Sequence, residues 1–240
     1  MARNPKWNRD ELILTLDLYF QLSPGEIHAR NPKIIRLSEE LNRLPFVGSK
    51  PDAVRFRNPN GVGLKLSNFL SIDPSYRGKG MERRGKLDEE IFVEFVGDQK
   101  LLRKLAGQIR SIVEDESLKR EIERIEEEPN IQVREGQVLT RLHKFRERNP
   151  QLTRRKKDTV LRITGKLACE VCGFDFSEAY GELGEGFAEC HHIRPLSQLD
   201  SVRETRLEDL SIVCSNCHRM LHRGEKWIDV SELRDRLKMK

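Results

Sequence analysis

The sequence contains no long hydrophobic run. The longest apolar stretches span a handful of the 240 residues, and the mean hydropathy is −0.64. Because a bilayer-spanning helix needs roughly 18 consecutive apolar residues, the sequence excludes a membrane span. The first residues also lack the apolar stretch of a secretory signal peptide, so we expect a cytoplasmic protein. Internal repeats and low-complexity tracts are absent as well, which argues against a repeat architecture.

The sequence also lacks a large net charge of either sign. Forty-four Lys and Arg against 39 Asp and Glu leave a net charge of +5, which permits a polyanionic partner without requiring one. The charge is concentrated, however, because residues 134–166 hold eleven basic and three acidic residues. We expect this segment to contact backbone phosphates, and the alternative is a solvated helix face. Its candidate DNA-binding residues are Arg154, Arg155, Lys156 and Lys157.

Helical patterns dominate the first two thirds of the chain. Asn8 with Glu11 predicts a capped helix start, and Asn31-Pro32 predicts a second helix start. Apolar residues at intervals of three and four predict further helices within 64–70 and 87–113. We therefore expect a mostly helical domain over residues 1–80 and a helical, basic connector over 81–155. The apolar face of 87–113 would form either a dimer interface or the core of its own domain.

A basic, turn-rich loop interrupts the helical pattern between residues 55 and 65. It combines arginines, an aromatic residue and amide side chains, which suit base-edge contacts or stacking on an altered base. The alternative is that Phe56 belongs to the core and the glycines form a turn. The candidate DNA-binding residues of this loop are Arg55, Arg57, Asn58, Asn60 and Lys65.

Because we expect a reducing compartment, the five cysteines do not indicate a disulfide framework. Cys169 with Cys172, and Cys214 with Cys217, form two Cys-x-x-Cys pairs that together could bind one tetrahedral Zn²⁺. The alternative is two unrelated pairs of buried thiols. A closed Cys₄ site leaves no open position for chemistry, so its role would be to hold two distant segments together. We interpret Cys190, the remaining cysteine, as a small buried hydrophobe.

Four histidines lie close to the cysteine pairs. His191 and His192 stand between the pairs, and His218 and His222 follow the second pair with a spacing that puts both on one face of a helix. Three neutral imidazoles suit a divalent ion and leave room for water and a phosphate oxygen. Consecutive strand residues point to opposite faces, so His191 and His192 cannot both face the metal from an ideal strand.

These motifs resemble the HNH endonucleases of the ββα-metal fold. The resemblance covers about residues 156–225, and its narrower features, Cys172–Phe176 and the Tyr180-Gly181 turn, are similar to the McrA-type, modification-dependent restriction enzymes. The expected fold class is α+β, with an HNH domain and its Cys₄ zinc site over 156–240 after the helical segments. The motifs that carry the resemblance are Cys169-x-x-Cys172, Glu189-Cys190-His191-His192-Ile193-x-Pro195-Leu196, and Glu208-Asp209-Leu210-Ser211-Ile212-Val213-Cys214-x-x-Cys217-His218-x-x-x-His222.

The resemblance implies a role for each matched residue. His191, His218 and His222 would hold one catalytic divalent metal, Mg²⁺, Mn²⁺, Co²⁺ or Ni²⁺, and His192 would be the general base. The opposite assignment of His191 and His192 stays open. Asp209 stands where the family has an asparagine. Its carboxylate can accept hydrogen bonds that brace the hairpin but cannot donate as an amide does, and it could instead lie near the metal.

The resemblance also implies the substrate. It indicates a type IV restriction enzyme that cleaves double-stranded DNA containing 5-methyl- or 5-hydroxymethylcytosine, with the N-terminal domain as the reader. Because one such centre cuts one strand, we expect a homodimer. Two other functions compete with this one. The chain could be a non-catalytic zinc module that binds nucleic acid, or a homing or repair nuclease that acts on unmodified DNA.

Overall fold

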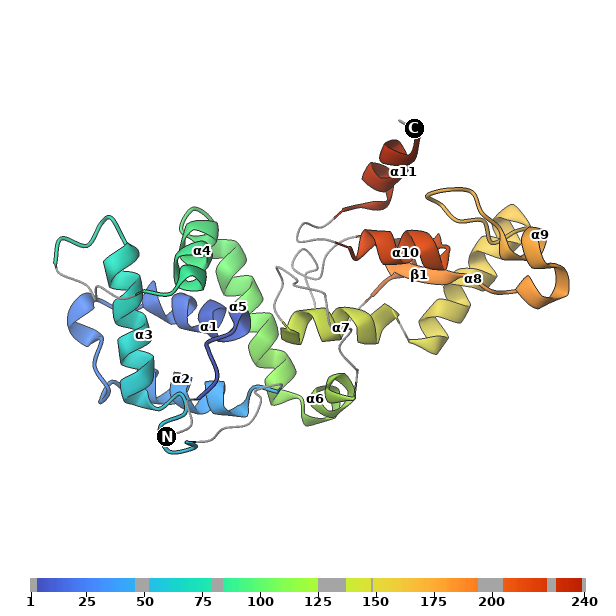
Figure 1. Ribbon diagram of the computed structural model, residues 1–240. Coiled ribbons are helices and arrows are strands. Elements are labelled where there is room, and N and C mark those ends of the chain that lie inside the picture. Colours follow the sequence, from blue (N-terminus) through green and yellow to red (C-terminus); the bar gives the residue numbers. More distant parts are fainter. Residues whose placement is uncertain are drawn as a thin grey trace. The chain divides into compact units, whose positions relative to one another are not determined.

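The computed structural model describes residues 4–45, 52–78, 84–124, 137–147, 149–193, 205–223 and 228–238 (Figure 1). The chain divides into two compact units. The first holds the residues up to 123 together with 135–139, and the second holds 124–134 and 140–240. The described part is mostly helical with one two-stranded sheet in the second unit, in agreement with the expected α+β class. No helix in these ranges is long and apolar enough to cross a membrane.

The first unit is built around α1 (Arg9–Tyr19), which is buried from Asp10 to Tyr19. The sequence-predicted capping box is confirmed, since the Asn8 side chain accepts the Glu11 N–H at 3.0 Å and the Glu11 carboxylate accepts the Asn8 N–H at 2.7 Å. Four helices pack against α1, as the blue to green ribbons of Figure 1 show: α2 (Pro32–Arg43), α3 (Pro59–Ile72), α4 (Lys86–Phe95) and α5 (Gln99–Glu114).

The apolar stretch 87–113 forms two helices, as the sequence predicts. Ile91 and Phe95 of α4, and Ile109 of α5, are fully buried. This apolar face is therefore the core of its own unit. The unit continues through α6 (Glu116–Glu123), so the boundary expected near residue 80 falls inside it.

The second unit is organised by an antiparallel pair of short strands, β1 (Glu189–His192) and β2 (Leu210–Val213), followed by α10 (Ser215–Leu221). Cys190 pairs with Ile212, and His192 pairs with Leu210. The other elements here are α7 (Gln137–Glu147), whose first residues group with the first unit, and α8 (Pro150–Thr164), α9 (Phe176–Tyr180), α11 (Val230–Lys238) and the short 3-10 turns η2 (Gly181–Gly184) and η4 (Leu207–Asp209).

Two small cores lie against the two strands. Cys190, Leu210 and Ile212 form one of them with Leu152 and Val160 of α8. Cys190 is 3% exposed, and burial raises the pKa of its thiol to about 11, which confirms its interpretation as a buried hydrophobe. The second core contains Val213, Leu221 of α10 and three of the four paired cysteines, Cys169, Cys214 and Cys217, whereas Cys172 is exposed. The strands thus join a helix-covered face to a cysteine-rich face.

Candidate metal centres and nucleic-acid contacts

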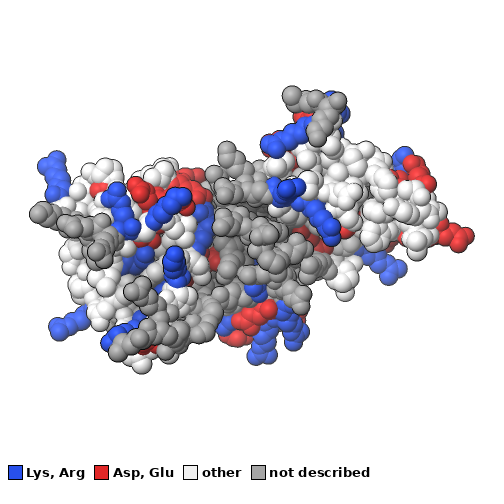
Figure 2. Space-filling view, in the orientation of Figure 1, with Lys and Arg blue, Asp and Glu red and all other residues white. Residues whose placement is uncertain are grey.

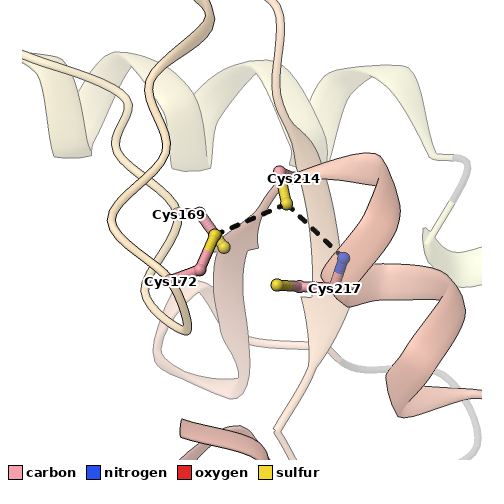
Figure 3. A group of neighbouring side chains, drawn as sticks. All are labelled: Cys169, Cys172, Cys214 and Cys217. Atoms are coloured by element: carbon pink, nitrogen blue, oxygen red, sulfur yellow. Dashed lines mark hydrogen bonds between the residues drawn. The ribbon is translucent and has the colours of Figure 1, made fainter. Parts of the chain in front are cut away.

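The two Cys-x-x-Cys pairs come together in the second unit. Figure 3 shows the loop that holds Cys169 and Cys172 facing the start of α10, which supplies Cys214 and Cys217. The four sulfur atoms all lie within 4.8 Å of one another. Four sulfur ligands about 2.3 Å from a tetrahedral zinc are about 3.8 Å apart. The 3.7 Å between the sulfurs of Cys172 and Cys214 fits this spacing.

Backbone geometry forms both halves of the cysteine cluster. In the first pair, Gly173 adopts a left-handed φ of 78° and donates its N–H to the Cys169 carbonyl at 2.8 Å, which closes the turn. In the second pair, Cys214 is the N-cap of α10, and its sulfur accepts the Cys217 N–H at 3.4 Å. Burial raises the pKa of Cys217 above its ordinary value, so zinc must displace a proton there.

A second cluster is formed by three of the four histidines. The Nε2 atoms of His218 and His222 on α10 are 3.1 Å apart, and Nδ1 of His191 on β1 faces the same group. All ligand atoms of the cluster lie within 4.8 Å of one another. The helical spacing of His218 and His222 therefore brings both rings to one point, and this donor set suits a divalent ion.

The fourth member of this cluster is Glu147, the last residue of α7, which the sequence analysis missed. Its Oε1 lies 3.0 Å from Nδ1 of His191, and its Oε2 lies 3.3 Å from Nε2 of both His218 and His222. Glu147 stands 44 positions before His191 and belongs to no recognised motif. The one signal for it in the sequence is that it is the only acidic residue between 136 and 157.

Strand alternation places the side chains of His191 and His192 on opposite faces of β1. His192 pairs with Leu210, so its side chain lies on the strand face that α8 covers, whereas His191 points toward α10. His192 is fully buried, with Nε2 at 3.4 Å from the Thr205 hydroxyl, and it is not a member of the ligand cluster. Its backbone N–H donates to Oε1 of Glu147 at 3.2 Å.

A second carboxylate, Glu189 on β1, was also not singled out from the sequence as a site residue. Its Oε2 lies 2.5 Å from Nδ1 of His218 and so leaves Nε2 directed at the cluster. Burial alone would lower the pKa of His218, but hydrogen bonds with Glu147 and Glu189 outweigh it and raise this pKa to about 9. The hydrogen bond with His218 in turn lowers the pKa of Glu189.

Asp209 lies away from the ligand cluster, at the end of η4 beside the hairpin. Its side chain accepts the Arg206 N–H at 2.9 Å, and its carbonyl accepts the Ile193 N–H at 2.8 Å. These contacts brace the segment that enters β2. Pro195 and Leu196 of the sequence motif lie outside the described residues.

Among the N-terminal candidates for DNA binding, some make contacts within the protein and others are exposed. Arg57 is buried, pairs with Glu11 at 2.6 Å and lies 4.3 Å from the Trp7 ring centroid. Lys65 pairs with Asp88 at 2.9 Å, and Asn58 caps α3 by accepting the Gly61 N–H. Phe56 is buried, as the alternative interpretation has it, but Gly61 and Gly63 lie in α3 and form no turn, so the expected loop is helical from Pro59 onward. The exposed candidates are Arg55 and Asn60.

The basic candidates near the nuclease motifs lie on α8. Arg154 and Arg155 are exposed, whereas Lys156 and Lys157 are partly exposed and Lys157 donates to the Gly186 carbonyl at 3.0 Å. The partly buried Leu152 and Val160 of this helix pack on the hairpin, whereas Arg154 and Arg155 face solvent. Over the first unit, Figure 2 shows basic and acidic side chains interspersed on the face drawn.

Comparison with known families identifies the part of the chain that holds both clusters. Residues 169–224 match the family model described as HNH endonuclease. The match supports assignment of this region to the HNH superfamily and suggests a nuclease that binds DNA. It includes the four paired cysteines and all the clustered histidines, but not Glu147. No curated protein and no solved structure matches the chain.

Proposed function

We propose that the protein is a metal-dependent endonuclease that hydrolyses phosphodiester bonds in DNA. The observation that supports this is the convergence of His191 on β1 with His218 and His222 on α10, whose first turn also belongs to the Cys₄ cluster; the ligand atoms lie within 4.8 Å of one another. The Cys₄ cluster would hold a structural Zn²⁺, and the histidines would hold Mg²⁺, Mn²⁺, Co²⁺ or Ni²⁺. The family match over 169–224 covers both donor sets.

The residues around the centre have distinct roles in this proposal. The bound metal supplies positive charge that stabilises the charge developing on the phosphate. His192 stands beside the ligands without belonging to them, and as a neutral histidine it would accept the proton of the attacking water. Glu189 orients the His218 ring through Nδ1. Asp209 braces the chain that leads into β2.

The proposed substrate is double-stranded DNA with 5-methyl- or 5-hydroxymethylcytosine. This choice rests on the resemblance of the zinc-loop residues to the McrA-type enzymes. The helical first unit would read the modified base, with Arg55 and Asn60 as its exposed candidates. The basic side of α8, next to the nuclease hairpin, would contact backbone phosphates, chiefly through Arg154 and Arg155.

The proposal includes a homodimer. A single ββα-metal centre cuts one strand, so a double-strand break needs two centres, and a symmetric pair of chains supplies them most simply. The expected products are linear molecules from circular DNA. Nicked circles alone would instead indicate one active centre for each bound substrate.

A cleavage panel tests this function. Purified protein is incubated with Mg²⁺, Mn²⁺, Co²⁺ or Ni²⁺ and matched plasmids that carry unmodified, 5-methyl- or 5-hydroxymethylcytosine. We expect cleavage only with metal and only of a modified plasmid. Equal cleavage of all plasmids would favour a homing or repair nuclease, and no cleavage under any condition would favour a non-catalytic zinc module.

A single variant separates a nuclease at this centre from a contaminating activity. His192→Ala removes the proposed base but none of the clustered ligands. We expect it to abolish cleavage while the zinc content and the affinity for DNA stay at the wild-type level. Substantial cleavage by this variant would contradict the assignment of His192.

A further inference from the structure

We propose that Glu147 is a fourth ligand of the nuclease metal, supplied by a helix that lies outside the region matched to the HNH family. The inference rests on the proposed nuclease centre, but it concerns metal binding, which can be measured without DNA. Glu147 is the last residue of α7, and its side chain is 6% exposed. The carboxylate is therefore held inside the protein at the position where the three imidazoles meet.

The distances fit the spacing of ligands around one ion. Four nitrogen or oxygen ligands about 2.05 Å from a tetrahedral ion are about 3.3 Å apart. Glu147 lies 3.0 Å from Nδ1 of His191 and 3.3 Å from Nε2 of both His218 and His222. The two α10 nitrogens are themselves 3.1 Å apart. Oε1 makes the contact with His191 and Oε2 makes those with α10, and the ligand atoms of all four side chains lie within 4.8 Å of one another, which is compatible with one coordination shell.

The orientation of Glu147 is fixed from the strand side. Its Oε1 accepts the backbone N–H of His192 at 3.2 Å. Oε2 lies toward the two α10 histidines, so each carboxylate oxygen faces a different part of the cluster. A hydrogen-bonded carboxylate of this kind is a pre-oriented ligand, because little side-chain freedom is lost when the ion binds.

A fourth protein ligand changes the character of the centre. A catalytic site usually has three protein ligands and an open position, whereas four protein ligands give a closed shell. Three histidines alone match the open pattern. With Glu147 the shell is closed before DNA arrives, so the substrate phosphate must replace the carboxylate or enter as a fifth ligand. Glu147 would thus set both the metal affinity and the access to the metal.

Cobalt binding to the full chain tests this inference. Protein with zinc retained at the Cys₄ site is titrated with Co²⁺, and the visible absorption is recorded. We expect an intense four-coordinate spectrum for the wild type. Glu147→Gln keeps the size of the side chain and one acceptor oxygen. We expect it to bind Co²⁺ at least tenfold more weakly, because changes to the groups around a metal typically lower its affinity by about 10- to 100-fold. Its absorption should also be weaker, as in a site of higher coordination number. Glu178→Gln is the matched control, because Glu178 is exposed and pairs only with Lys166 among the described residues.

The outcomes distinguish this inference from the proposed function. Wild-type affinity and an unchanged spectrum in Glu147→Gln would overturn the role of Glu147 while leaving a three-histidine centre intact. Failure of the wild type to bind Co²⁺ beyond the Cys₄ site would overturn the nuclease centre itself. If Glu147→Gln loses its zinc and does not fold, Glu147→Asp replaces it, because this variant keeps the charge but draws the carboxylate back by one methylene: weaker Co²⁺ binding than in the wild type supports ligation by Glu147, and wild-type binding contradicts it.

Discussion

Nδ1 of His218 and Oε2 of Glu189 are 2.5 Å apart, which joins α10 to the first residue of β1. The contact fixes which nitrogen of the ring is directed at the metal cluster. Nε2 is left 3.1 Å from Nε2 of His222, on the side where a shared ion would lie. A carboxylate behind a ligating histidine both orients the ring and increases its basicity.

Loss of this carboxylate should weaken metal binding without unfolding the domain. In Glu189→Gln the amide cannot supply the negative charge, so we expect the affinity for Ni²⁺ to fall about 10- to 100-fold. Isothermal titration of zinc-loaded protein measures this affinity. Glu178→Gln should bind Ni²⁺ as the wild type does. An unchanged affinity in Glu189→Gln would mean that Glu189 does not support the ligand.

Metal uptake at the histidine cluster should depend on pH. The pKa of His218 in the metal-free protein is raised to about 9, above the ordinary value of about 6.5. The protonated ring therefore stabilises the metal-free fold fully below about pH 6.5, and this contribution is lost as the pH rises through about 9. Because the metal must displace that proton, affinity should rise about tenfold per pH unit between these limits.

The proton released on binding gives an independent check. Titrations of Ni²⁺ in buffers with different ionisation enthalpies measure it directly, and at neutral pH we expect about one proton from His218 in addition to that released by any other ligand. A pH-independent affinity with no proton release would show that His218 is not protonated in the metal-free protein, or does not ligate.

Loss of one zinc ligand should unfold the nuclease unit and leave the first unit folded. Cys217→Ser opens the cluster that joins the Cys169 loop to α10, and the core around it is small. We expect the variant to lose its zinc. Of the two thermal unfolding transitions, the one that belongs to the second unit should disappear. Calorimetry and metal analysis measure both effects.

Cys190 supplies the matched control for that experiment. It is also buried but packs on α8 and belongs to neither cluster. Cys190→Ala should therefore keep one zinc per chain and lose only the modest stability of a truncated core side chain, about 1 kcal/mol. Retention of zinc and of both transitions by Cys217→Ser would contradict a structural Cys₄ site.

Local patterns in the sequence predict much of this architecture. Caps such as Asn8 with Glu11 satisfy backbone groups within one turn, so a few adjacent residues specify them. The helical spacing of His218 and His222 likewise fixes their common face. The paired cysteines predict their meeting because a tetrahedral zinc needs four ligands. In each case the chemistry depends on spacings that are visible in the chain.

Contacts between distant elements are not visible in that way. Glu147 reaches the histidines only because α7 ends beside β1, and its isolation among basic residues, the one signal in the sequence, does not point to the histidines. The separation of His191 from His192 follows from strand alternation once β1 is placed against α10. Arg57 is a third example. Its guanidinium group suits a contact with DNA, but it pairs with Glu11, which lies 46 positions away in the sequence.

Arg55 and Arg57 allow a matched test of the first unit, because they differ by two positions and in burial. Arg57→Ala removes the partner of the buried Glu11 carboxylate and should destabilise this unit by about 3–5 kcal/mol. Arg55 is exposed, so Arg55→Ala should change stability by less than about 0.5 kcal/mol. Urea unfolding of the two variants measures the difference. Equal stability would mean that the Arg57–Glu11 pair does not support the fold.

DNA binding by the same two variants separates recognition from folding. If Arg55 contacts a phosphate, Arg55→Ala should weaken binding at all sequences and lower the salt dependence by about one counterion. If it contacts the modified base instead, the preference for the modified duplex should fall while the salt dependence stays the same. Wild-type affinity, preference and salt dependence in Arg55→Ala would remove this residue from the reader surface. A loss of DNA affinity in Arg57→Ala is evidence for recognition only if the variant remains folded at the temperature of the binding measurement.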